Sequence, residues 1–303
     1  MRVQAVQMGH GSTFCDDILP LDRKMNDRLR QIRRSVESRV QKFGVRPSAP
    51  IGRKLAALCG RPSYTALPAT FYIQMSLPII FLPAMPCDGR MYADQVEGLK
   101  DLASPSVQVL AHATFAESAD RLLNSTTGTF ILAGTAYGGC LAMEVLARAP
   151  DRVRGLWLMN CQPGVHPNPC AARKIGVRIR RGEHENVIDE FADNAIPADD
   201  IASREAFVQM ARDSGAALFA RQSDATLGRS DHWSTLSASK VPTLLIWGEA
   251  DHLVPLDVGA RIARVIPHAR FEPLRGCGHF PTLERPALCT KIARDWMTCS
   301  EFP

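Results

Sequence analysis

A short segment near the middle of the 303-residue chain constrains the fold more than any other part of the sequence. The apolar run Phe130–Ala133 predicts a buried strand, and apolar residues recur at helical spacing over residues 141–146. Gly134 and Gly138 mark a sharp turn between strand and helix, which forces the central residue, Ala136, towards positive φ. Strand, glycine-flanked turn and helix form the frame of a nucleophile elbow. In this chain the frame is present, but Ala136 has no nucleophilic atom.

Two later segments supply an acid and a histidine. Asp251 closely follows the apolar run at residues 241–248, and His279 lies in the glycine-rich segment 276–279 after a second predicted strand. Ligands of open α/β sheets collect at the carboxyl ends of the strands, which favours a site at Asp251 over a simple helix cap. Glu249 is the rival acid, and we favour Asp251 over it.

These residues, in this order, resemble the α/β-hydrolase superfamily, and in particular its short bacterial esterase-like serine hydrolases. The resemblance covers the chain from Met75 to the end and implies an α/β fold, a mostly parallel sheet flanked by helices with a helical cap. Family members carry serine where Ala136 stands. By resemblance, His279 is the general base, Asp251 orients it, and a nucleophile at 136 would attack an acyl carbon.

The resemblance also implies an oxyanion hole built from two backbone N–H groups, those of Met85 and Tyr137. The family has a His-Gly pair before the first of these donors, and Pro83-Ala84 stands here instead. Loss of the nucleophile from such a triad costs about a millionfold in turnover, so the chain is expected to bind substrate and barely turn it over. Either a serine has been replaced in a working site, which the retained glycines, acid and histidine favour, or the chain is naturally non-catalytic.

The expected domain organisation has three parts. Residues 75–161 and 230–303 form the α/β core, residues 162–229 form the helical cap, and residues 1–74 form a basic extension outside the family pattern. The predicted strands are residues 77–82, 107–111, 130–133, 152–159, 241–248 and 269–274. The predicted helices of the core are residues 117–123, 256–265 and 284–298, and those of the cap are residues 171–181, 186–192 and 201–220.

The predicted substrate is a small molecule with an acyl bond, namely an ester, thioester or lactone. Candidate apolar walls of its pocket are Ala84, Met91, Tyr92, Trp233 and Phe280. We interpret Cys140 as a buried structural thiol, one helical turn beyond the elbow, that points back into the sheet packing. Two alternatives remain open: a non-catalytic ligand-binding protein on the same fold, and a hydrolase of C–C or amide bonds.

The charge distribution separates the two ends of the chain. Residues 1–74 hold 13 Lys and Arg against 5 Asp and Glu, and the remainder holds 23 against 26. The acidic remainder gives no support for nucleic-acid binding. Residues 21–43 predict a basic amphipathic helix that is either a surface helix or a contact with a partner or membrane surface. No cofactor, metal site or membrane-spanning segment is expected, and the cytoplasm is the expected location.

Overall fold

Six parallel strands form the centre of the protein. The computed structural model describes residues 77–300 and 302. In that part of the chain the strands lie in the order β2-β1-β3-β4-β5-β6, and each neighbouring pair is parallel. The strands are β1 (Pro78–Leu82), β2 (Ser104–Val107), β3 (Phe130–Thr135), β4 (Val153–Met159), β5 (Thr243–Gly248) and β6 (Arg270–Leu274). A parallel sheet with helical connections confirms the predicted α/β class.

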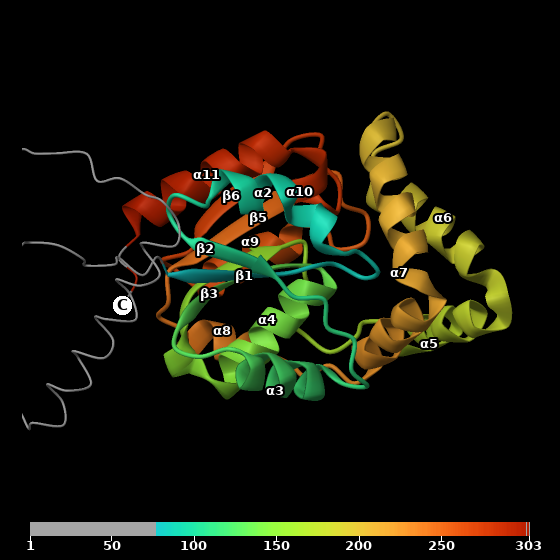
Figure 1. Cartoon of the computed structure of the whole chain (residues 1–303), viewed down its shortest axis with the longest axis horizontal. Coiled ribbons are helices and arrows are strands. Elements are labelled where there is room, and N and C mark those ends of the chain that lie inside the picture. The colour runs from blue at the N-terminus through green and yellow to red at the C-terminus, as the bar shows by residue number, and fades with distance from the viewer. Residues whose placement is uncertain (1–76, 301, 303) are drawn as a thin grey trace, which may run out of the picture. The chain divides into compact units, whose positions relative to one another are not determined.

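Helices cover both faces of this sheet (Figure 1). One face packs against α2 (Ala93–Gly98) and α11 (Pro286–Cys299). The other face packs against α3 (Phe115–Ser125), α4 (Tyr137–Arg148), α8 (Trp233–Ala238) and α9 (Leu256–Val265). Because successive side chains of a strand point to opposite faces, Ile79 and Ile80 belong to two different core clusters. Strands buried on both faces must be apolar throughout, and every residue of β3 and β5 is buried.

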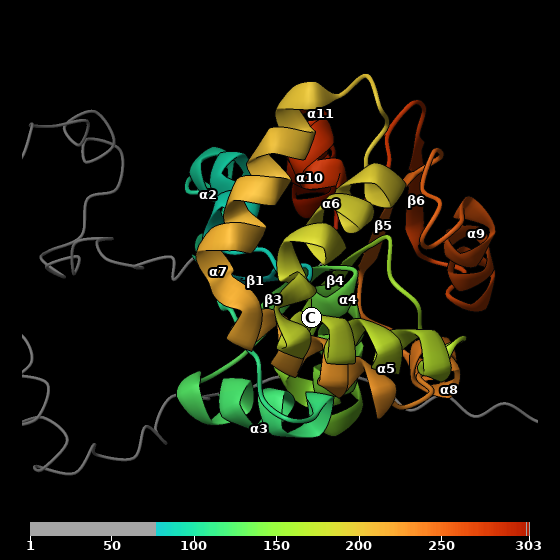
Figure 2. The ribbon, with the colours of Figure 1, turned by 90° about the vertical axis from the view of Figure 1, so that its right-hand side faces the viewer.

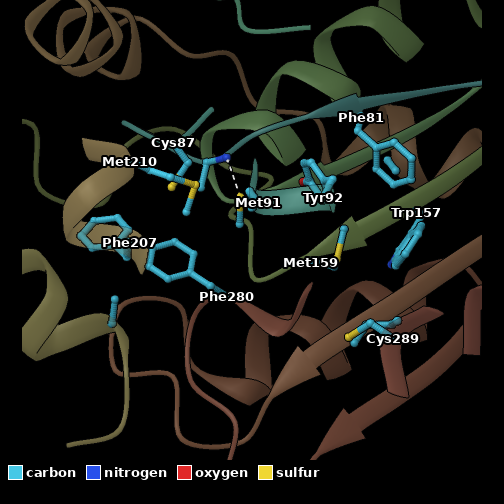
Figure 3. Packing of buried hydrophobic residues seen from close by; sticks show 14 of the residues in the cluster. Phe81, Cys87, Met91, Tyr92, Trp157, Met159, Phe207, Met210, Phe280 and Cys289 are labelled. Atoms are coloured by element: carbon cyan, nitrogen blue, oxygen red, sulfur yellow. Dashed lines mark hydrogen bonds between the residues drawn. The ribbon is translucent and has the colours of Figure 1, made fainter. Parts of the chain in front are cut away.

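The core on the α2 and α11 face is rich in aromatic residues (Figure 3). The rings of Phe81 and Trp157 meet edge to face, with centroids 5.8 Å apart. Further along the same cluster, Phe207 stacks on Phe280 at a centroid distance of 4.9 Å. Phe207 belongs to the helices that follow β4, so one continuous apolar cluster joins these helices to the sheet.

Three helices lie beyond the carboxyl ends of the strands (Figures 1 and 2). They are α5 (Pro169–Arg178), α6 (His184–Ala195) and α7 (Ile201–Leu227), with a π-helical turn at Ile179–Glu183 between the first two. Gly215, at φ 77°, interrupts α7. The last residue of α6 is tied to the core, because the Ala195 carbonyl accepts a hydrogen bond of 2.7 Å from the His279 N–H. All three helices fall within residues 162–229.

One predicted strand is wrong. Residues 107–111 were expected to form the second strand, whereas the structure places β2 at Ser104–Val107. This strand lies at the edge of the sheet, is half-exposed, and contains Pro105 between two serines, so it has no apolar run. Its position is set by pairing with β1, which a local pattern cannot show.

The remaining elements are short or adjust the predicted bounds. The predicted helix at 284–298 corresponds to α11, and a separate short helix, α10 (Pro281–Glu284), precedes it. Two 3-10 helices, Gly89–Tyr92 and Pro150–Arg152, complete the described part. The predicted extension 1–74 and its basic helix at 21–43 lie outside the described residues. None of the helices that the structure describes combines the length and apolarity needed to cross a bilayer.

Candidate functional site

The turn between β3 and α4 has the backbone of a nucleophile elbow. Ala136 has φ 50° and ψ −111°, a backbone conformation that residues other than glycine rarely adopt. The neighbouring glycines are required by close packing of the backbone. A Cβ atom on Gly138 would overlap the carbonyl oxygen of Leu82, and one on Gly134 would overlap the backbone of Gly138. The sharp turn thus places Ala136 at the carboxyl edge of the sheet.

The predicted acid and base lie together at the same edge. Asp251 follows β5, His279 follows β6, and both are buried, with 4% of each residue exposed. Nδ1 of His279 lies 2.8 Å from Oδ2 of Asp251. A carboxylate accepts the Nδ1–H of such an imidazole, which leaves Nε2 as the nitrogen able to exchange a proton with a ligand. His279 and Ala136 line one cavity.

Besides His279, other groups donate hydrogen bonds to the Asp251 carboxylate. Its Oδ1 accepts the backbone N–H groups of Leu253 and Val254 at 2.8 and 3.1 Å. Burial by itself would raise the pKa of Asp251, but the charge and hydrogen bond of His279 and the bonds from Asn160 and Val254 hold this pKa below its usual value. Asp251 therefore stays ionised and can stabilise a positively charged His279 ring.

Sequence reasoning missed Asn160. This residue immediately follows β4 and has φ 44°, in the left-handed region. Its side-chain amide donates to Oδ2 of Asp251 at 2.5 Å, and its Oδ1 accepts the Gly248 N–H at 3.2 Å. A polar residue directly after a buried strand was the available signal, because ligand sites form at such strand ends.

Glu284 was also missed. Both of its carboxylate oxygens are used by the loop that carries the histidine. They accept the N–H groups of Gly278 and Phe280, at 2.5 and 2.8 Å, on either side of His279. Burial raises the pKa of Glu284 above its usual value, although these two hydrogen bonds oppose the shift. Glu284 fixes the backbone on both sides of His279.

A cavity of about 450 Å³ opens between the strand ends and the helices α5 to α7. This volume suits a small organic ligand. Met85 and Tyr137, the predicted oxyanion donors, both line it beside Ala136 and His279. Most of its wall is apolar, and its further lining includes Cys161, Ala172, Ile175, Phe191, Leu253, Val254, Pro255 and Val258.

The predicted pocket wall needs correction. None of its five residues, Ala84, Met91, Tyr92, Trp233 and Phe280, lines this cavity. Met91, Tyr92 and Phe280 point into the core instead (Figure 3), and Ala84 is fully buried beside Met91. The Trp233 ring lies under the Arg261 guanidinium, 4.1 Å from ring centroid to carbon. The loops approach the site as expected, but packing turns these side chains away from it.

Three further candidates for the chemistry occupy defined places. Thr135 is fully buried and its hydroxyl bonds the Tyr92 hydroxyl at 2.9 Å, away from the cavity. Glu249 is exposed to solvent. Cys140 is buried as expected, but its thiol lies in the cavity wall, where it donates to the Gln162 carbonyl at 3.4 Å. The predicted burial of Cys140 is confirmed, and the residue also borders the cavity.

The titratable residues of the site form no metal centre. Within residues 77–300 and 302, no group of three or more His, Cys, Asp or Glu side chains is placed to hold a metal ion. All seven cysteines that the structure describes are free thiols.

Comparisons with known proteins agree with this geometry. Over 184 residues the chain is 26% identical to a 2-hydroxy-6-oxononadienedioate/2-hydroxy-6-oxononatrienedioate hydrolase of Paraburkholderia phymatum, which covers 55% of this chain and 61% of that protein. The match thus spans about three fifths of that relative. The chain is also 26% identical to the pimeloyl-[acyl-carrier protein] methyl ester esterase of Aromatoleum aromaticum, over 58% of this chain and 77% of that esterase.

A solved structure shows the same fold. A thermophilic esterase from Thermogutta terrifontis superposes with a TM-score of 0.68 and 25% identity, covering 74% of this chain and 90% of the esterase. The sequence profile of the alpha/beta hydrolase family matches residues 79–291, well over half of the chain. With the elbow, the parallel sheet and the Asp251–His279 pair in place, the chain belongs to the α/β-hydrolase family.

Proposed function

We propose that the cavity binds a carboxylic ester or related acyl compound, such as a thioester or lactone, and that Ala136 prevents its covalent cleavage. The observation that carries this proposal is the position of Ala136. It occupies the strained centre of the elbow and lines the same cavity as His279, whose other ring nitrogen is engaged by Asp251. This arrangement supports a nucleophilic site that lacks its attacking atom.

With serine at position 136, the reaction follows the usual course of this arrangement. His279 takes the hydroxyl proton as the oxygen attacks the acyl carbon, and returns the proton to the leaving group. Asp251 stabilises the charged ring. Water then attacks the acyl-enzyme with His279 again as base, releasing the acid and restoring the hydroxyl.

The backbone beside Ala136 would stabilise the oxyanion of the intermediate. Tyr137 is the first residue of α4, so its N–H has no acceptor within the helix, and the helix dipole adds in the same sense. We assign the second donor to the N–H of Met85, on the loop after β1, which also lines the cavity. The helices of residues 162–229 act as the cap that encloses the acyl group.

Two relatives support an acyl substrate. The methyl ester esterase of A. aromaticum and the T. terrifontis esterase are both named for ester cleavage. Without the nucleophile, turnover falls by about a millionfold, which leaves binding as the activity of this chain. A non-catalytic ligand-binding role is the second candidate, and the same residue, Ala136, favours it.

The test is restoration of activity. The Ala136→Ser protein is assayed with p-nitrophenyl esters of increasing acyl length, beside Ala217→Ser on the exposed side of α7 as a matched control. We expect at least about a thousandfold gain for Ala136→Ser, abolished when His279→Ala is added. No gain over Ala217→Ser would contradict the acyl-hydrolase proposal. Saturable ester binding without turnover in Ala136→Ser would favour the ligand-binding role instead.

A further inference from the structure

One cation lies in the wall of the cavity. Arg229, just after α7, is the single Lys or Arg among the described residues that line it, and no Asp or Glu is among them. Most of the surrounding wall is apolar. A guanidinium keeps its charge at all accessible pH values, so the cavity carries a permanent positive charge.

Among the described residues, this guanidinium has only neutral acceptors. Its Nε donates to the carbonyl of Gly164 at 2.9 Å and one terminal nitrogen to that of Val165 at 3.3 Å. The other terminal nitrogen lies 3.8 Å from the Cys140 sulfur. A guanidinium has five N–H groups, so two remain for a ligand. No carboxylate of the described residues forms an ion pair with Arg229.

Several other arginines on the same helices are paired with carboxylates, whereas Arg173 and Arg221 are exposed to solvent. Arg178 of α5 forms a two-bonded pair with Glu190 and also contacts Glu183. Arg180 pairs with Asp224 of α7. The contrast shows that carboxylates are available on these helices and that none is directed to Arg229. A charged group in a partly buried apolar setting gains most from a counter-charge. No described carboxylate supplies one to Arg229, so an anionic ligand could.

Two more donors line the same cavity. Ser223 is a residue only 2% exposed, and its hydroxyl has no hydrogen-bond partner among the described residues. Nδ1 of His166 accepts the Asn168 N–H at 3.0 Å, which leaves the ring proton of the neutral form on Nε2. Burial, and secondarily the charge of Arg229, lowers the pKa of His166, so the ring is neutral near pH 7.

We propose that Arg229, with Ser223 and His166, forms a subsite for a carboxylate carried by the substrate at the end remote from its acyl bond. The substrate class is then the half-ester, or the corresponding thioester, of a dicarboxylic acid. This inference rests on the proposed acyl-binding function and names its substrate. A planar carboxylate matches the two free N–H groups of a guanidinium better than any neutral ligand group does.

Helix α4 relates the position of the elbow to that of the proposed carboxylate subsite. The Cys140 N–H bonds the Ala136 carbonyl, so the two residues lie one helical turn apart on the elbow helix. Four residues advance a helix by about 6 Å. Because Arg229 lies 3.8 Å from the Cys140 sulfur, its guanidinium lies beside the first turn of the elbow helix, in the same cavity as Ala136 and within reach of a short dicarboxylic chain.

The test measures binding by calorimetry to the full chain, which does not consume the ligand because residue 136 is alanine. The ligands are monomethyl adipate, dimethyl adipate and hexanoate. We expect the half-ester to bind at least about tenfold more tightly than the diester. In Arg229→Gln this preference is lost, because the half-ester loses much more affinity than the diester does. Arg212→Gln, an exposed arginine paired with Glu185 on α6, retains it.

Each outcome separates the two proposals. Equal binding of both esters, or an unchanged preference in Arg229→Gln, overturns the subsite and leaves the acyl proposal standing. If hexanoate binds through Arg229 as tightly as the half-ester does, the ester group adds no affinity. That result supports the subsite and contradicts the acyl proposal. No binding of any ligand contradicts both. Should Arg229→Gln fail to fold, Ser223→Ala is used, for which a loss of about threefold specific to the half-ester is expected.

Discussion

Asn160 and His279 share one oxygen of Asp251. The Asn160 amide donates to Oδ2 at 2.5 Å, and Nδ1 of His279 lies 2.8 Å from the same atom. With the two backbone N–H groups on Oδ1, this carboxylate accepts four hydrogen bonds. An acid so restrained holds the imidazole in one orientation and one tautomer, which is what a general base at this position requires.

The first prediction concerns Asn160→Gly, which keeps the left-handed backbone and removes the side chain. Asp251 and the Gly248 N–H each lose a partner, so the free energy of unfolding at pH 7 should fall by about 2 kcal/mol. The depressed pKa of Asp251 contributes stability above the ordinary pKa of 3.8, and that stability is lost as pH falls through the folded-state pKa. With a weaker depression, the variant should unfold at a higher pH in acid titrations followed by circular dichroism. An unchanged acid midpoint would count against the role of Asn160.

The second prediction concerns Glu284→Ala. Two buried N–H groups beside His279 lose their acceptor, so the free energy of unfolding should fall by about 3 kcal/mol. In the Ala136→Ser background kcat should drop by about a hundredfold, because His279 is displaced. Glu205→Ala, on the exposed side of α7, serves as the control and should change stability by less than about 0.5 kcal/mol.

The pH dependence of the Glu284 effect has a defined sign. The pKa of Glu284 is raised in the folded protein, so its stabilising contribution is fully present below the ordinary value of 4.5 and declines as pH rises through the folded-state pKa. The stability gap between the unmodified chain and Glu284→Ala should therefore be larger at pH 4 than at pH 7. Urea unfolding at both pH values measures this gap, and a larger gap at pH 7 would be inconsistent with a raised pKa.

The third prediction concerns backbone strain at the elbow. Ala136 holds φ 50° and ψ −111°, which glycine adopts without penalty. Ala136→Gly should therefore stabilise the protein by about 1 kcal/mol after the entropy of the unfolded chain is counted. Ala206→Gly, in the interior of α7 before the break at Gly215, should destabilise it by a similar amount. Thermal melts of the two variants should shift in opposite directions, and a shift of both to lower temperature would rule out strain at Ala136.

The fourth prediction concerns the space at Gly138. A methyl group there would overlap the carbonyl oxygen of Leu82, and the backbone of β1 cannot move without disturbing the sheet. Gly138→Ala should lower the free energy of unfolding by about 3 kcal/mol. Gly228→Ala is the matched control, because nothing lies within 4 Å of its added Cβ atom. Equal stability of the two variants would show that the elbow is less tightly packed than described.

Local sterics explain what could be predicted from the sequence. The elbow needs small residues where the backbone passes itself, and these are neighbours in the chain. Helix α9 has the predicted bounds, Leu256–Val265, because its apolar spacing is regular. Strand β2 could not be predicted in the same way. Only one of its four residues, Val107, is apolar, and pairing with the edge of β1 makes Ser104–Val107 a strand.

The acid and the histidine of the site could be predicted from the sequence, whereas the residues that line its cavity could not. Asp251 and His279 each stand in a distinctive local context, whereas Asn160 acquires its role from a partner 91 residues away. The direction in which Met91, Tyr92 and Phe280 point is set by packing against distant core residues. Their positions in the sequence therefore led to the wrong prediction of the pocket wall. That no carboxylate of residues 77–300 pairs with Arg229 is likewise visible only in the folded structure.

The central claim is that residues 136, 251 and 279 form one nucleophilic site from which only the attacking atom is missing. Labelling with a fluorophosphonate, followed by intact mass and peptide mapping, tests it most directly, because only a serine activated by a base reacts readily. We expect one adduct, on residue 136, in Ala136→Ser, and none at that residue in the unmodified chain or in Ala136→Ser with His279→Ala. A folded Ala136→Ser protein that stays unlabelled, or labels equally well without His279, would contradict it.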